Sequence, residues 1–180
     1  MKFALRNYNS NTEKLQVSNN YHKVISNSKH VIYSGILLGF ILMFLFILII
    51  NIFIRNIEIT FYKKLYIILL LVPLHESIHL LFFPSLKNAE VGFYTKIFSF
   101  YVTTNDSLTK GRFLLISIAP FLFITVIPFI ITCFYFNIDI VYLLLFNSLG
   151  AGVDILYFFI ILKLPSVSEI KIFNNEIYYR

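Results

Sequence analysis

Three residues that can do chemistry lie close together in an apolar segment: His75, Glu76 and His79. On a helix, residues four positions apart lie one turn apart on the same face, so both imidazoles can reach one metal ion. Glu76 projects beside them, where its carboxylate can take a proton from water held by the metal as that water attacks a carbonyl. The H-E-x-x-H pattern therefore predicts a hydrolytic zinc site.

The surroundings of this motif favour a functional interpretation, because ionisable groups are costly within lipid and usually mark a site. The alternative is that the histidines hydrogen-bond across a helix bundle while Glu76 pairs with a basic residue. The other long apolar runs contain no lysine or arginine, so a metal ion is the better candidate counter-charge for Glu76. Haem is disfavoured, because two histidines one turn apart cannot both be axial ligands of one iron.

Four apolar runs predict an all-α membrane protein with about four transmembrane helices. A helix needs about 20 apolar residues to cross the hydrocarbon layer, and such runs must be helical because the backbone has no water to bond there. The runs cover residues 31–53, 65–83, 113–136 and 140–162.

The composition excludes several other classes of protein. Of 180 residues, 58% are hydrophobic and only 13% charged, with a mean hydropathy of +0.80. Soluble domains carry about 25% charged residues, so a soluble enzyme, a disordered chain and a nucleic-acid binder are all excluded. The single cysteine, Cys133, excludes a disulfide framework and a multi-cysteine zinc site.

The charge distribution predicts the orientation in the cell membrane. Three of the fifteen basic residues, Arg55, Lys63 and Lys64, fall between the first two runs. The other twelve fall on the side of both termini, which the positive-inside rule makes cytoplasmic in a multi-pass protein. We therefore expect a cytosolic tail at 1–30, a four-span domain with the zinc site at 31–163, and a cytosolic tail at 164–180.

The long loop between the second and third runs is too apolar for a solvated linker. Residues 91–103 are rich in β-branched and aromatic side chains, which predicts a short β-hairpin at the cytoplasmic interface. One more short strand is expected around 170–173.

Depth in the membrane selects the third ligand that a catalytic zinc requires. His75 lies eight residues before Phe83, and Asp154 lies nine residues before Lys163. At 1.5 Å per residue these positions are about 12 and about 13 Å from the same membrane face, because the second and fourth runs point the same way. Asp154 is thus the predicted ligand; the alternative is a protonated carboxyl that bonds across the bundle.

Asn147, Gly150 and Asp154 share one helical face. We expect Gly150 and Gly152 to let the fourth helix approach the second closely. Asn147 is a candidate to support a ligand or hold substrate, and an ordinary interhelical hydrogen bond is the alternative.

Several segments, in the same order, resemble a bacterial family of membrane-embedded zincin peptidases, from about residue 62 to the C-terminus. They are 75–83, Ala119-Pro120-Phe121, Asn147 with 150–154, and Lys163-Leu164-Pro165. The resemblance implies that His75, His79 and Asp154 bind zinc and that Glu76 is the catalytic base. The arrangement is also similar to site-2 proteases, except that Asp154 is followed by Ile155 rather than by glycine.

The leading hypothesis is an intramembrane zinc metalloprotease that hydrolyses a peptide bond of a membrane or membrane-proximal protein. Its partners would be that substrate and the lipid bilayer, with no nucleic acid. The alternative is a non-catalytic, zinc-stabilised membrane interaction, regulatory or immunity protein, which would have no need for Glu76. A transporter is disfavoured because the chain has no paired repeat halves.

Overall fold

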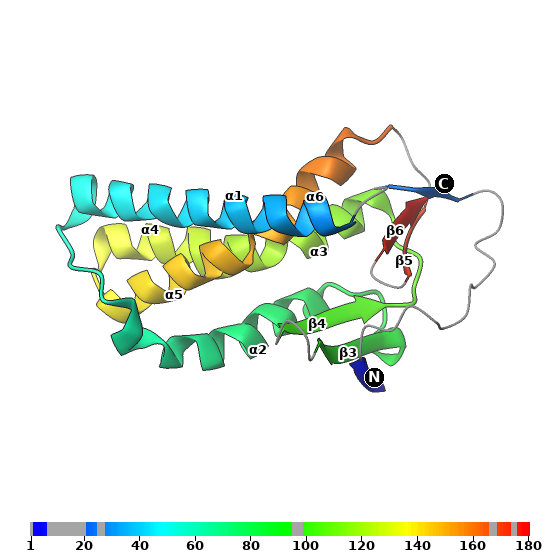
Figure 1. The fold of residues 1–180 in the computed structure, drawn as a ribbon, viewed down its shortest axis with the longest axis horizontal. Coiled ribbons are helices and arrows are strands. Elements are labelled where there is room, and N and C mark those ends of the chain that lie inside the picture. The colour runs from blue at the N-terminus through cyan, green and yellow to red at the C-terminus, as the bar shows by residue number, and fades with distance from the viewer. Residues whose placement is uncertain (1, 7–20, 25–27, 95–98, 166–168, 174–175) are drawn as a thin grey trace.

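The computed structural model describes residues 2–6, 21–24, 28–94, 99–165, 169–173 and 176–180. Most of these residues are helical, and the helices lie along the long axis of the molecule (Figure 1). The main helices are α1 (Ser28–Ile49), α2 (Tyr66–Leu81), α3 (Lys110–Phe121), α4 (Ile127–Phe134), α5 (Ile138–Gly150) and α6 (Gly152–Lys163). Short π-helical or 3-10 segments lie at Ile50–Ile54, Phe61–Lys64, Leu86–Asn88 and Leu122–Val126.

Two continuous helical stretches are long and apolar enough to cross a membrane, His30–Ile54 and Lys110–Phe134. They correspond to the first and third predicted runs, and they indicate that the protein associates with membrane. α5 and α6 reach the required length only as a pair, and α2, with 16 residues, is shorter. Four full crossings stay a prediction.

The fourth predicted run is not one straight helix: α5 and α6 are bent by 51° where they meet. Ala151 joins them with a ψ of −3°, outside the usual α-helical value. Glycines flank it on both sides, and because glycine is a poor helix former the break costs little at this point. The bend puts Asp154 in the first turn of a new helix.

Two small sheets lie at one end of the bundle, and they include the first and last strands of the chain (Figure 1). The first sheet has the order β1 (Lys2–Arg6), β3 (Ala89–Tyr94), β4 (Ser99–Thr104), and β1 runs parallel to β3. β3 and β4 are antiparallel and include the predicted hairpin residues that are described. The turn of that hairpin, 95–98, lies outside the described residues.

The second sheet has the order β2 (His22–Lys23), β6 (Glu176–Tyr179), β5 (Ile170–Phe173). β5 is the strand expected at 170–173. Backbone bonds between Leu108 and Ile170 join it to the segment before α3. Hydrogen bonds from Ser107 and Tyr21 lower the pKa of Glu169, next to this sheet, to about 2, so this carboxylate is charged at neutral pH.

The two predicted tails contribute three strands that the sequence patterns did not reveal: β1, β2 and β6.

The first turn of α3 binds the ends of two other helices. Lys110 Nζ donates to the carbonyls of Leu162 and Leu164, at the end of α6. Arg112 Nε donates to the carbonyl of Phe82, at the end of α2. Cations are favourable at helix C-termini, where carbonyls lack helical partners.

Glycines make the contact between α1 and the α5–α6 bend very close. A Cβ atom on Gly152 would lie 2.2 Å from the Gly35 carbonyl oxygen, and one on Gly39 would lie 2.2 Å from the Leu149 carbonyl oxygen. The expectation that Gly150 and Gly152 bring the fourth helix close to the second is therefore wrong. Gly152 packs against α1, and a Cβ on Gly150 would meet nothing within 4 Å.

This contact predicts opposite effects for two neighbouring substitutions. Gly152→Ala should lower the free energy of unfolding by about 1–3 kcal/mol, because backbone must move to admit the methyl group. Gly150→Ala should leave it unchanged or raise it by about 0.4–1 kcal/mol, through a less flexible unfolded chain. Thermal unfolding in detergent measures both, and equal stability of the two variants would contradict the close packing.

Candidate metal centre

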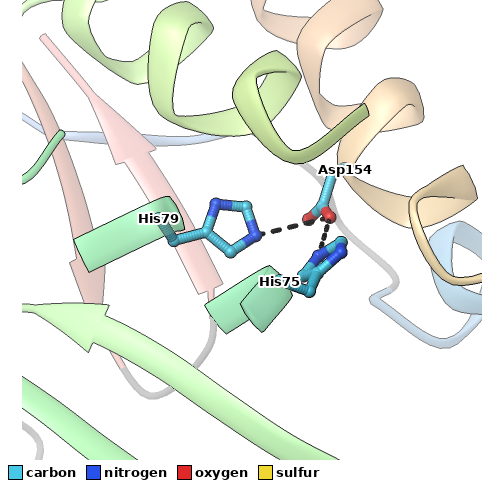
Figure 2. Close-up of side chains that lie close together, drawn as sticks. All are labelled: His75, His79 and Asp154. Atoms are coloured by element: carbon cyan, nitrogen blue, oxygen red, sulfur yellow. Dashed lines mark hydrogen bonds and ion pairs between the residues drawn. The ribbon is translucent and has the colours of Figure 1, made fainter. Parts of the chain in front are cut away.

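Two imidazoles from α2 and one carboxylate from α6 meet inside the bundle (Figure 2). Asp154 Oδ2 is 3.0 Å from His75 Nε2 and 3.5 Å from His79 Nε2. The three ligand atoms lie within 4.8 Å of one another. The residues chosen from spacing and depth are therefore neighbours, as a shared metal ion requires, and their roles as ligands stay a prediction.

The two distances from Asp154 Oδ2 suit a tetrahedral zinc ion. With bonds of about 2.0–2.1 Å, two ligand atoms of such an ion are about 3.3 Å apart. The two separations from Asp154 Oδ2 lie on either side of this value. Three protein ligands also leave one position open for water or substrate, which is typical of catalytic rather than structural zinc.

Hydrogen bonding prepares His79 to bind a metal through Nε2. Its Nδ1 lies 2.9 Å from the carbonyl oxygen of Ile116 on α3. A carbonyl only accepts, so Nδ1 carries the proton and donates. The lone pair of the neutral ring is then on Nε2, the atom that faces Asp154, and the ring is held in a ligating orientation.

Asn147 prepares His75 in the same way. The Asn147 Nδ2 donates to the Pro120 carbonyl at 3.1 Å and to Thr125 Oγ1 at 2.9 Å, which leaves Oδ1 as the acceptor. That oxygen lies 2.9 Å from His75 Nδ1. Asn147 is buried, at 1% exposure, and its bonds join α5 to both α3 and α2. The interhelical bond and the support of a ligand are thus the same contact, and a substrate role for Asn147 stays a prediction.

Glu76 is half-buried beside this cluster on α2. The charged groups that act on it are His79, His75 and Asp154. Within the described part of the chain it forms no ion pair with lysine or arginine, so pairing with a basic residue does not account for it. Its electrostatic neighbours in the described structure are therefore the three residues of the cluster.

Sequence reasoning missed three acceptors around the cluster: the Ile116 carbonyl, which bonds His79, and the Pro120 carbonyl and Thr125 hydroxyl, which bond Asn147. A backbone carbonyl has no residue type to recognise, and a threonine in an apolar helix commonly bonds its own backbone. Asn147 was found because an amide within an apolar run is conspicuous.

A protein-family model matches the part of the chain that contains this cluster. The model of a family described as "putative zincin peptidase" matches residues 68–168, from α2 through α6. The chain belongs to this family. Membership implies a zinc metallopeptidase, and the match covers both helices that carry the cluster. No curated protein and no solved structure matches the chain.

The hydrogen bond to His75 predicts an effect on metal binding. Asn147→Ala should weaken zinc binding about 10–100-fold, because the imidazole loses the acceptor that fixes its tautomer and orientation. Competition with a chromogenic chelator in detergent measures the affinity. Ser148→Ala is the matched control, since the hydroxyl of this buried neighbour donates to the Leu145 carbonyl of the same helix. Equal losses in both variants would contradict a specific role for Asn147.

Proposed function

We propose that the protein is a membrane-embedded zinc metalloprotease that hydrolyses a peptide bond of a membrane or membrane-proximal protein. The observation that carries the proposal is the meeting of His75, His79 and Asp154 from two separate helices. Membership of a zincin peptidase family supports it independently. In this proposal these three residues hold zinc, and Glu76 is the catalytic base.

The residues have distinct tasks in this reaction. Zinc, when bound, polarises a substrate carbonyl and lowers the pKa of water. Glu76 takes one proton from the attacking water as the water oxygen bonds to the carbonyl carbon. It then returns that proton to the amide nitrogen as the C–N bond breaks. Ile116 and Asn147 hold the imidazoles in place throughout, so that the ligands need not reorganise during the reaction.

The proposed topology is four crossings with both termini in the cytoplasm. The directions of α1, α2, α3–α4 and α5–α6 alternate along the bundle, and the first and last strands lie at the same end (Figure 1). Twelve of the fifteen basic residues belong to segments that this topology assigns to the cytoplasm. The cluster would then be reached from the cytosolic half of the membrane, because His79 is in the last turn of α2.

We further propose that β4 captures the substrate. A helical substrate hides its carbonyls in its own hydrogen bonds, so it must be extended before hydrolysis. In the described sheet β4 is an edge strand, and it packs near α2. An extended segment can pair with such an edge through backbone hydrogen bonds.

Proline substitution tests the strand addition. Neighbouring residues of a strand direct their N–H groups to opposite sides, so one of Tyr101 and Val102 faces the free edge. Proline at whichever of these two residues faces the free edge removes an N–H that would bond the substrate. Cleavage should slow at least tenfold, since a loss of about 1.4 kcal/mol in binding free energy is a tenfold change. Zinc content should be unchanged. Undiminished cleavage would contradict substrate pairing with β4.

Separate variants test the ligands and the base. Asp154→Ala should lose most of its zinc, because two histidines of one helix remain as ligands. Glu76→Gln should keep near-stoichiometric zinc and lose hydrolysis. Metal analysis of detergent-purified protein measures the first effect. Mass spectrometry of new peptide termini, in membranes from cells that make wild type or Glu76→Gln, measures the second. Identical peptide termini would instead favour a non-catalytic, zinc-stabilised interaction protein.

A further inference from the structure

The contact between His79 and α3 occurs at a special place in that helix. Ile116 precedes Pro120 by four residues, and both lie inside α3. In an α-helix the N–H of residue 120 would donate to the carbonyl of residue 116. Proline has no N–H, so this carbonyl lacks its usual helical partner. It is the same carbonyl that accepts the Nδ1 proton of His79.

We propose that Pro120 is a positioning residue for the metal centre: by lacking an N–H it releases the Ile116 carbonyl, which fixes the tautomer and orientation of His79. The inference rests on the proposed zinc site and adds a residue that touches neither metal nor substrate. A carbonyl already bonded within α3 would be a poorer acceptor, because its hydrogen-bonding capacity would be shared. His79 would then lose the preference for protonation at Nδ1 and the fixed direction of Nε2.

Pro120 also acts on the other histidine. Its own carbonyl accepts from Asn147 Nδ2, and Thr125, in the π-helical segment that follows, accepts the second N–H. Because the Asn147 amide group donates to these two acceptors, its Oδ1 is oriented toward His75 Nδ1. This stretch of the chain therefore supports both imidazoles, although α3 contributes no candidate ligand. It acts on His79 directly through the Ile116 carbonyl, and on His75 indirectly through Asn147.

The carbonyls of two other helical prolines accept hydrogen bonds from their own helices rather than from another helix. Pro128 lies at the start of α4 and its carbonyl accepts from Thr132 of the same helix. Pro73 lies in α2 and its carbonyl accepts from Ser77 of the same helix. Among the described residues, no hydrogen bond joins Pro128 to the cluster, so Pro128 offers a matched control in the same helical stretch as Pro120.

Zinc affinity and stability, measured together, test the inference. Pro120→Ala restores an N–H that competes for the Ile116 carbonyl, and zinc binding should weaken about 10–100-fold. Its melting temperature should be unchanged or higher, because alanine favours the helix. Pro128→Ala should bind zinc as wild type does. Lactic acid introduced at position 120 is the decisive comparison, since it matches alanine but has an ester oxygen in place of the N–H. It should bind zinc nearly as wild type does.

The outcomes separate this inference from the proposed function. A wild type that binds no zinc would overturn both. If wild type binds zinc and Pro120→Ala binds it with the same affinity, only the role of Pro120 is overturned. The same holds if alanine and lactic acid at position 120 lower the zinc affinity equally. If Pro120→Ala does not fold, nitrogen NMR of His79 in zinc-free wild type decides. Protonation at Nδ1 supports the inference, and protonation at Nε2 overturns it.

Discussion

A carboxylate between two imidazoles, in apolar surroundings, is the interaction on which the rest of the structure depends. Polar groups without partners are costly there, so each ring nitrogen must face an acceptor, a donor or a metal. One nitrogen of each histidine is satisfied by protein, at the Ile116 carbonyl or at Asn147. The other nitrogen of each faces Asp154, and a cation among these three groups would complete the set.

The position of Asp154 depends on how tightly α1 packs. α6 begins at Gly152, directly against the backbone of Gly35 and Gly39, where no side chain fits between the helices. The break at Ala151 and this contact together set the direction of α6. The long, mostly exposed α1 therefore contributes to the site without reaching it. Its glycines leave room for the backbone at the start of α6, and they thereby determine where α6 can lie.

What the sequence predicted follows from local geometry. Helical periodicity puts His75 and His79 on one face, and the rise per residue puts Asp154 at their depth. The first argument holds in any bundle, whereas the second also requires that the second and fourth runs point the same way. The bend at Ala151, the contact of Gly152 with α1 and the pairing of β1 with β3 depend on which distant segments meet. Periodicity and composition do not encode that choice, and for this reason Gly152 was paired with the wrong helix.

α3, which supplies none of the three candidate ligands, lies between the two helices that supply them. α3 packs against both α2 and α6, whereas α2 and α6 have few direct contacts with each other. Arg112 and Lys110 hold the ends of these two helices, and the Ile116 carbonyl holds His79 between them. A shift of α3 would thus move the histidines and Asp154 by different amounts. Because a metal site tolerates only a few tenths of an ångström in its bonds, the packing of α3 determines whether three suitable side chains become a metal centre.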